Sequence, residues 1–277
     1  MGPGLGGGHG RQQGHHGLIS DNIINLNVVL ANGTAIRVNE TSHADLFWGM
    51  KGAGHNFGIV TSFELRVYPR EVDSWYYHNY IWTEDKLELL FTAANELHDN
   101  GNTPVNMVAN FVTFAMNQTI SKTDVSSDIM FVAQIGYVSN GVHQPVIFWT
   151  FAYRGSADEA EKILAPFNNI EAVYQDYGDV TYPRLSEAQG TAMNTETCAP
   201  NHTWITSTVG LKTYNITTTR QIYELNKQYI KQYPQLLSPA VVHEGYSTAA
   251  VHRVRSEDSA VPFRDYDFLT YVNSSST

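Results

Sequence analysis

The sequence is poor in cysteine. Its 277 residues include a single one, Cys198. One cysteine forms no disulfide within the chain and supplies no spacing that is typical of a zinc site. We therefore interpret Cys198 as a free or buried thiol rather than as a catalytic nucleophile. A fold held together by internal disulfides is excluded.

Charge is also scarce, and its balance is negative. Charged residues make up 16% of the chain, and the formal net charge is -10. With no basic stripe to neutralise phosphates, a nucleic-acid partner is not expected. No apolar run is long enough to span a bilayer, so a membrane partner is not expected either. Hydrophobic residues make up 42% of the chain, which is typical of a globular protein.

The first residues lack the basic and apolar segments of a signal peptide. Asn-x-Ser/Thr sequons nevertheless begin at six positions, Asn32, Asn39, Asn117, Asn201, Asn215 and Asn273. Such glycosylation acceptors are typical of a secreted glycoprotein. We therefore expect a secreted protein whose signal peptide is absent from this chain.

Glycine, in contrast, is concentrated at the start. In MGPGLGGGHGRQQGHHGLISDN, six glycines fall within the first ten residues. No Lys-Ser/Thr pair follows to complete a Walker pattern, and the one G-x-G-x-x-G match follows no predicted strand. A P-loop or Rossmann site is therefore not expected. His9, His15 and His16 have no carboxylate or fourth histidine at a suitable spacing, so no metal site is predicted.

The next residues predict a hairpin, a helix and a strand. Apolar residues alternate on both sides of Asn32-Gly33, which indicates strands over about 25–30 and 34–38. A short helix follows, with Thr41 or Ser42 as its cap and Gly52 at its end. A strand over about 57–68 comes next. The second glycine cluster, 52–58, either presents backbone groups to a ligand or is only a tight connection.

A boundary is predicted near residues 69–74, beyond which the pattern of the sequence changes. We expect an amphipathic helix that begins after Thr83 and ends at Asn100-Gly101, and a second helix with a capping box at Ser156-x-x-Glu159. A third helix is predicted over about 217–232. Strands are expected within 106–115, 128–139, 145–155, 203–211 and 238–254, whereas 267–277 is interpreted as a loop. This order predicts an α+β fold, with a largely antiparallel sheet and helices on one face.

Aromatic residues gather at the start of this second region, at Trp75, Tyr76, Tyr77, Tyr80 and Trp82. They either line a cleft for a sugar or phenol or pack one edge of the sheet.

Three ordered stretches carry a family resemblance: GGGHGRQQGHHGLISDNI, LANGTAIRVNE and ADLFWGMKGAGHNFGIVTSFELRVYP. They resemble the second half of the FAD-binding domain of the vanillyl-alcohol-oxidase/PCMH flavoproteins. Farther on, HEGYSTAAVHRV and AVPFRDYDFLTYVN resemble the berberine-bridge-enzyme-like branch, in particular its fungal oxidases. The resemblance implies a partial PCMH-type FAD-binding domain over 1–70, an antiparallel-sheet substrate domain over 71–262, and the start of the berberine-bridge-like C-terminal segment over 263–277.

Family members carry a further FAD subdomain before the glycine run, with a pyrophosphate loop and usually a histidine bonded to the flavin. Neither His9 nor Cys198 matches a family attachment residue, so covalent attachment is not carried over. We expect the chain to be truncated at both ends, and we expect apolar surface and strand edges to be exposed as a result.

The resemblance implies a cofactor site formed mainly by backbone. Its residues are Gly7, Gly8, Gly10, Gly17, Asn22, Gly54, Asn56, Gly58, Ile59 and Val60. The two asparagines either contact FAD or bond their own backbone. On the substrate side, the resemblance places Glu244 and Tyr246 on a strand that faces the flavin, and Tyr271 near the active site. Glu244 is then a candidate base, or else a surface carboxylate; Tyr271 is a candidate base or hydrogen-bond donor, or else a packing residue.

The expected function is FAD-dependent oxidation of an alcohol, a sugar or a related small molecule. Hydride passes to the flavin, and oxygen is the expected electron acceptor. Two alternatives stay open: a non-catalytic remnant that is unable to hold FAD, and a carbohydrate-binding module suggested by the aromatic run.

Overall fold

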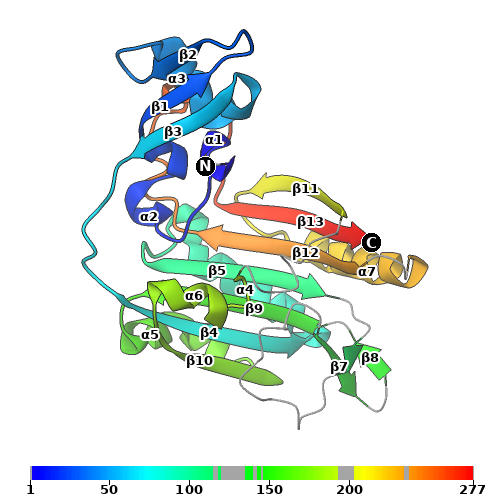
Figure 1. Ribbon diagram of the computed structural model, residues 1–277. Coiled ribbons are helices and arrows are strands. Elements are labelled where there is room, and N and C mark those ends of the chain that lie inside the picture. Colours follow the sequence, from blue (N-terminus) through cyan, green and yellow to red (C-terminus); the bar gives the residue numbers. More distant parts are fainter. Residues whose placement is uncertain are drawn as a thin grey trace. The chain divides into compact units, whose positions relative to one another are not determined.

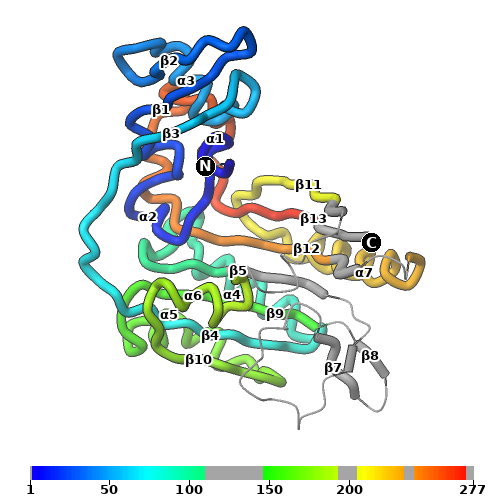
Figure 2. The backbone as a smooth tube through the Cα atoms, in the orientation of Figure 1, coloured from blue at the N-terminus to red at the C-terminus, as the bar shows by residue number. Residues whose placement is uncertain are grey.

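The computed structural model describes residues 2–114, 118–119, 135–139, 142–144, 146–192, 203–233 and 237–276 (Figures 1 and 2). Cys198, the sequons at Asn117 and Asn201, and most of the strand expected over 128–139 lie outside these residues. The chain forms two units. Unit 1 contains 1–71, 101–106 and 246–266, and unit 2 contains 72–100, 107–245 and 267–277. Both units are discontinuous along the chain, whereas the predicted domains are continuous; the roles given to those domains stay a prediction.

Unit 1 contains a three-stranded antiparallel sheet in the order β2-β1-β3. Its strands are β1 (Ile23–Val29), β2 (Ala35–Val38) and β3 (Ile59–Leu65). Leu30 and Thr34 close the first hairpin through a backbone hydrogen bond of 2.9 Å, and Gly33 has a φ of +83°. The hairpin predicted from Asn32-Gly33 is therefore confirmed.

Helix α3 (Ala44–Ala53) packs on this sheet, and its Phe47 and Met50 join the buried cluster around Leu26 and Val28. The residue that precedes the helix is His43, in a left-handed conformation with no side-chain cap. Neither predicted cap residue takes that place, because the Ser42 hydroxyl instead donates to the Arg37 carbonyl at 3.0 Å.

Gly52 interrupts the regular helix with a φ of +140°, as its predicted role as the end of the helix requires. A Cβ there would lie 2.5 Å from the Ala260 carbonyl carbon, so only glycine fits this close approach of two backbones.

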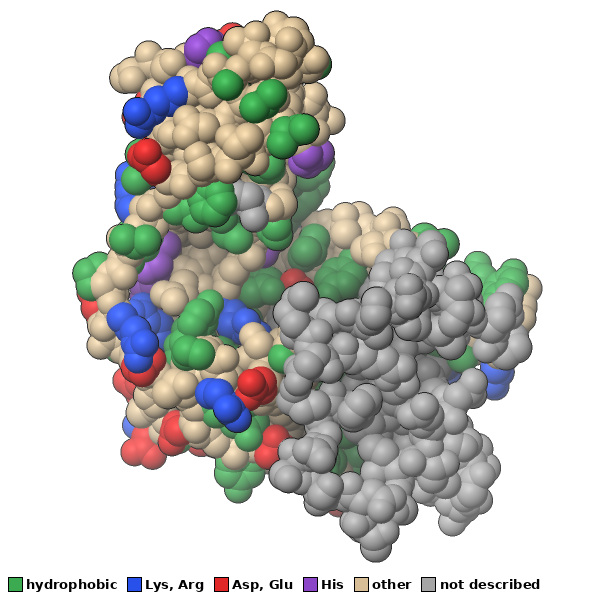
Figure 3. Space-filling view, viewed as in Figure 1, with side chains coloured by type: hydrophobic (Ala, Val, Ile, Leu, Met, Phe, Trp, Pro, Cys, Tyr) green, Lys and Arg blue, Asp and Glu red, His purple; other side chains and the backbone are tan. Residues whose placement is uncertain are grey.

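Short helical turns shape the glycine-rich loops of unit 1. They are α1 (Gly2–Leu5), α2 (Gln13–His16), η1 (Ile19–Asn22), η2 (Gly54–Asn56) and η7 (Ser256–Asp258). Strand β3 forms an edge of the sheet, and its Ile59 and Phe63 are 71% and 48% exposed. Hydrophobic side chains accordingly reach the surface of this unit (Figure 3), as expected for an exposed apolar strand edge.

Unit 2 is built on a seven-stranded antiparallel sheet in the order β10-β4-β9-β5-β12-β13-β11 (Figure 1). Its strands are β4 (Ser74–Thr83), β5 (Met107–Phe114), β9 (Val146–Arg154), β10 (Tyr174–Thr181), β11 (Thr203–Leu211), β12 (Leu237–Tyr246) and β13 (Phe268–Ser276). A smaller sheet contains β6 (Gln118–Thr119), β7 (Ile135–Ser139) and β8 (Val142–Gln144). The largely antiparallel α+β class is confirmed.

Helices α4 (Leu87–His98), α5 (Ala157–Asn168) and α7 (Ile216–Gln232) cover one face of the large sheet. Turns η3 (Glu84–Lys86) and η4 (Asp99–Gly101) flank α4. The predicted capping box is present at the start of α5, where Ser156 Oγ accepts from Glu159 N at 3.4 Å and Glu159 Oε2 accepts from Ser156 N at 3.4 Å. Asn215 caps α7 by accepting from Thr218 N at 2.9 Å.

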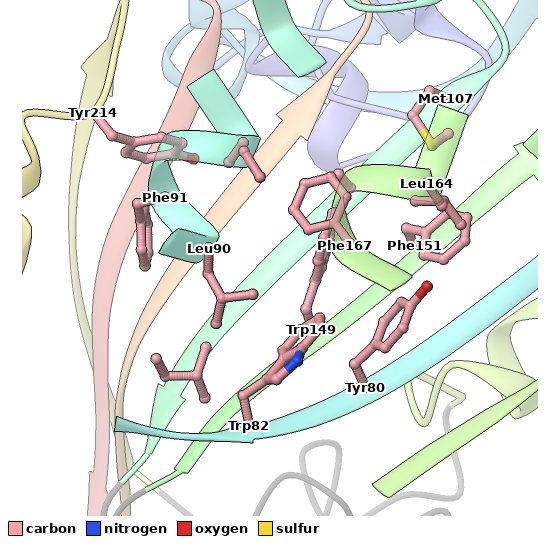
Figure 4. Close-up of a cluster of buried hydrophobic side chains, with 14 of the residues drawn as sticks. Tyr80, Trp82, Leu90, Phe91, Met107, Trp149, Phe151, Leu164, Phe167 and Tyr214 are labelled. Carbon is pink, nitrogen blue, oxygen red and sulfur yellow. The ribbon is translucent and has the colours of Figure 1, made fainter. Parts of the chain in front are cut away.

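The core beneath these helices is aromatic (Figure 4). Tyr80, Trp82 and Trp149 are fully buried, and the rings of Tyr80 and Trp82 stack at 4.6 Å between centroids. Trp75 and Tyr76 are buried as well. Most of the aromatic run therefore packs against the sheet rather than lining an open cleft.

One helix, α6 (Tyr182–Ala188), lies on the opposite face of the sheet. Asn79 alternates along β4 with the core residue Tyr80, so its side chain points away from α4 and α5, and it donates to the Ala188 carbonyl at 2.8 Å. The prediction that the helices cover one face of the sheet therefore holds for α4, α5 and α7 but not for α6.

Three strands depart from the sequence interpretation, and one of them, β4, was not predicted. Residues 267–277 were expected to form a loop, but β13 runs between β11 and β12 with a continuous register on the β11 side. That expectation was wrong because the polar end of β13 is held by backbone pairing with strands far away in the sequence. The edge strand β10 was not predicted either. Among the described residues, no helix is both long enough and apolar enough to cross a bilayer.

Candidate active site

The first glycine loop is closed by its own backbone. Gly7 and Gly8 have φ values of +111° and +82°, and their carbonyls accept from Ser20 N at 2.8 Å and Ile19 N at 3.0 Å. A Cβ on Gly8 would lie 2.9 Å from Ile19 Cδ1, whereas a Cβ on Gly10 would meet no atom within 4 Å. Of these three glycines, Gly10 is therefore the one with open space beside it, and its N–H and C=O both bond to Gln13.

Both asparagines of the predicted cofactor site donate hydrogen bonds to nearby backbone carbonyls. Asn22 Nδ2 donates to the carbonyls of His16 and Leu18, each at 2.9 Å, and Asn22 Oδ1 accepts from the Tyr68 hydroxyl at 2.6 Å. The exposed Asn56 donates to the Ala53 carbonyl at 3.0 Å. These bonds are those of turn-forming asparagines, and a contact with FAD stays a prediction.

The remaining predicted cofactor residues differ in their surroundings. A Cβ on Gly17, Gly54 or Gly58 would lie 2.6 to 2.9 Å from Asp21, Leu5 or Val29 respectively. These three glycines are therefore required by close packing inside unit 1.

The two apolar members of the predicted cofactor set lie next to each other on β3. Val60 packs against the buried cluster of unit 1, and Ile59 points to solvent. Of this pair, Ile59 is the side chain that a ligand can contact.

A buried ion pair fixes the end of the glycine loop. Arg264 donates to both oxygens of the Asp21 carboxylate, at 3.0 and 2.6 Å, and also to Ser259 Oγ at 2.7 Å. The two charged side chains are only 3% and 8% exposed. Because Asp21 Oδ2 also accepts from Leu18 N at 2.9 Å, the pair ties the 259–264 segment to the loop. The sequence patterns did not reveal this pair, since 243 residues separate its members.

Tyr246 lies in unit 1, beside residues that the sequence interpretation missed. Its ring stacks on that of His9, with 5.9 Å between centroids and 19° between planes. Gln13 is buried and bonds to His9, and a Cβ on Gly14 would lie 2.6 Å from the Val105 carbonyl oxygen. Among the described residues, the Oγ of the buried Ser247 has no hydrogen-bond partner. Gly14, in the short helix α2, was the only sign of these contacts in the sequence.

Glu244 and Tyr271 come together in unit 2. Tyr271 lies opposite Val242 in the β12–β13 register, which places Glu244 two residues along on the same face. The Tyr271 hydroxyl donates to Glu244 Oε1 at 3.2 Å. Burial raises the pKa of the Tyr271 phenol, and the neighbouring carboxylate raises it further. The phenol is therefore protonated at neutral pH and acts as a hydrogen-bond donor.

This pair faces away from the large helices. His243, between Val242 and Glu244 on β12, packs on the helix side against Phe91 and Tyr214, at 5.1 and 5.2 Å between ring centroids. Burial lowers the pKa of His243 to about 3, so its ring is neutral. Alternation along the strand turns Glu244 to the opposite face, where a carboxylate can meet a ligand.

No group of three or more potential metal ligands occurs within the part of the chain that the structure describes.

Comparisons with known proteins extend these observations. No family model matches the chain. It is 49% identical over 97% of its length to the FAD-linked oxidoreductase anuG of Penicillium roqueforti and 46% identical over 99% to OXR2 of Pyricularia oryzae, and it covers 49% of each. The chain therefore spans about half the length of the curated relatives it matches.

Solved structures share the fold. Xylooligosaccharide oxidase from Myceliophthora thermophila C1, solved with xylobiose, has a TM-score of 0.73 and 21% identity over 99% of this chain and 54% of its own. The BBE-like 1 protein of Physcomitrella patens has a TM-score of 0.72 and 18% identity, over 100% and 54%. The resemblance found in the sequence is confirmed: over almost its whole length the chain is similar to fungal proteins named FAD-linked oxidoreductases, and it shares its fold with solved oxidases and BBE-like proteins.

Proposed function

We propose that this chain takes part in the FAD-dependent oxidation of an alcohol, a sugar or a related small molecule, with oxygen as the electron acceptor. The observation that supports this most directly is the Tyr271–Glu244 pair on the face of the sheet opposite α4, α5 and α7. The relatives are named FAD-linked oxidoreductases, and one solved neighbour holds a disaccharide, which favours a substrate with hydroxyl groups.

Glu244 is the proposed base. One of its carboxylate oxygens accepts from Tyr271, which orients the carboxylate as a base for the proton of a substrate hydroxyl. Tyr271 stays protonated and holds this geometry. Bound FAD would supply the hydride acceptor for the substrate carbon that bears this hydroxyl. Tyr246 is proposed to contact the ligand through its ring.

The glycine loops are the proposed cofactor site. The space beside Gly10, where a Cβ would meet no atom within 4 Å, leaves room for a ligand. The buried Ser247 Oγ, which has no partner among the described residues, fits a polar ligand edge that supplies a hydrogen-bond partner. The 54–60 loop adds the exposed Ile59 for an apolar ring surface. We assign the cofactor role to the 1–70 region and the substrate role to the 71–262 region on this basis.

Titration of the purified 277-residue chain with FAD, followed by flavin fluorescence, tests the cofactor role. Saturable binding at a 1:1 ratio is expected, and hydrogen peroxide should then form when xylobiose is supplied in air. A chain that binds no FAD would contradict the proposal and favour the non-catalytic alternative.

The Glu244→Gln variant tests the base. It should bind FAD normally and lose roughly 100-fold or more in turnover, as removal of a general base does. Glu96→Gln, on the exposed side of α4, is the matched control and should behave as the wild type.

We also propose that the protein is secreted and glycosylated. The sequon residues Asn32 and Asn215 are both exposed in the structure, at the β1–β2 turn and at the start of α7. Expression in yeast behind a secretion leader should give a protein whose mass falls on treatment with an N-glycosidase; an unchanged mass would contradict the proposal.

A further inference from the structure

The side chain of Gln13 connects three parts of unit 1. Its Oε1 lies 2.9 Å from His9 Nδ1 and accepts from Gly10 N at 3.4 Å, and its Nε2 donates to the Ser247 carbonyl at 3.4 Å. Gln13 is 3% exposed. A buried amide with all of these contacts is held in one orientation.

Two backbone groups decide which end of the amide is which. Gly10 N is a donor and the Ser247 carbonyl is an acceptor, and neither can change its role. Turning the Gln13 amide over would set its NH₂ against the Gly10 N–H and its oxygen against the Ser247 carbonyl. The oxygen of Gln13 therefore faces Gly10 and His9.

This orientation fixes the tautomer of His9. Since Gln13 Oε1 only accepts, His9 Nδ1 must carry the hydrogen and donate it. In the neutral ring, Nε2 is then unprotonated, which is the reverse of the tautomer that free histidine favours. Nε2 makes no hydrogen bond to any other described residue, and the ring itself is exposed and stacked on Tyr246.

We propose that His9 is a further ligand-binding residue of the candidate site, where Nε2 accepts a hydrogen bond from an O–H or N–H donor, and that Gln13 is the positioning residue that sets its tautomer. The inference rests on the proposed function for the identity of the ligand. The donor is either an N–H or O–H of the flavin or a hydroxyl of the substrate, since both present the same chemistry to Nε2. Ser247 follows Tyr246 in the sequence, and its buried Oγ, which has no hydrogen-bond partner among the described residues, indicates a second polar contact at the same place.

The tautomer is measured without any ligand. Two-bond ¹H–¹⁵N correlation spectra of the ¹⁵N-histidine-labelled chain at about pH 8.5, well above the ordinary imidazole pKa of about 6.5, distinguish the two neutral forms. The wild type should show His9 with protonated Nδ1. Gln13→Met, which removes the acceptor, should shift His9 to the Nε2-protonated form, and Gln13→Glu, which keeps an acceptor oxygen, should restore protonated Nδ1.

His55, an exposed histidine of the same unit, is the internal control and should not change in any of these variants. An Nε2-protonated His9 in the wild type would overturn the proposal, and so would a His9 signal that Gln13→Met leaves unchanged.

The ligand role is tested with His9→Phe, which keeps a ring against Tyr246 and removes the nitrogens. A lost hydrogen bond to a ligand should weaken binding by about tenfold. If FAD alone binds more weakly to His9→Phe, the donor is on the flavin. If only xylobiose binding to the FAD-loaded chain weakens, the donor is a substrate hydroxyl.

Unchanged affinities for both FAD and xylobiose would refute the ligand role of His9. A wild-type chain that binds neither probe would instead contradict the proposed function, and the spectra would still decide whether Gln13 sets the tautomer.

Discussion

Removal of the Arg264 guanidinium should destabilise unit 1 strongly. In Arg264→Met, the Asp21 carboxylate stays 8% exposed but loses both charge-assisted hydrogen bonds, at 3.0 and 2.6 Å. Removing one partner of a buried pair costs about 3–5 kcal/mol, because the remaining charge is left uncompensated. With a urea dependence of about 2 kcal/mol/M, the unfolding midpoint should fall by roughly 1.5–2.5 M.

The chain offers a local probe for this experiment. Trp48 is the one tryptophan of unit 1. Its Nε1 donates at 2.8 Å to the carbonyl of Glu257, a residue close in sequence to Arg264. The difference between urea curves recorded with and without Trp48→Phe therefore reports on unit 1.

Two variants complete the test. Asp21→Asn/Arg264→Met should recover part of the loss, since it leaves no unpaired charge. Arg255→Met, which removes the exposed pair with Asp258, should leave the midpoint almost unchanged. An Arg264→Met midpoint equal to that of the wild type would refute the reasoning.

Three further predictions concern stability. Burial lowers the pKa of His243 and of His98 to about 3, below the ordinary value of about 6.5. The unfolded chain therefore takes up these protons first, and the free energy of unfolding should fall as pH drops from about 6.5 toward 3; His243→Phe should flatten this dependence, and an unchanged slope would contradict the assignment. Ser156→Ala should cost about 1 kcal/mol by removing the cap of α5, measured by urea unfolding, whereas Ser186→Ala in α6 removes no cap. Gly52→Ala should destabilise unit 1 by more than about 1 kcal/mol, because a Cβ would meet the Ala260 backbone; a thermal midpoint within error of the wild type would show that the loop adjusts freely.

Elements with local signals were predictable. The Asn32-Gly33 turn and the Ser156–Glu159 capping box depend on residues within a few positions of each other, and both formed as the chemistry of those residues requires. The start of α3 was mispredicted because Ser42 had a competing partner, the Arg37 carbonyl, five residues away on a paired strand. Strand β13 was missed because its stability comes from β11 and β12, not from its Ser-rich sequence.

The same distinction between local and distant signals applies to the candidate site. Glu244 and Tyr271 were proposed separately, from resemblance, and their contact follows from a strand register that no local pattern specifies. The contacts among His9, Gln13 and Ser247 join positions 234 residues apart, so sequence spacing gave no sign of them. Glycine was a reliable marker of close approach, as at Gly52 and Gly58, but it did not separate positions open to a ligand from positions filled by the protein itself.

The central claim is that Glu244, oriented by Tyr271, accepts the substrate proton during FAD-dependent oxidation. Stopped-flow absorbance of the FAD-loaded chain, mixed with xylobiose without oxygen, measures flavin reduction directly. We predict that Glu244→Gln slows flavin reduction roughly 100-fold or more while FAD affinity and the Glu96→Gln control stay at the wild-type level. Equal reduction rates for the wild type and Glu244→Gln would contradict the account.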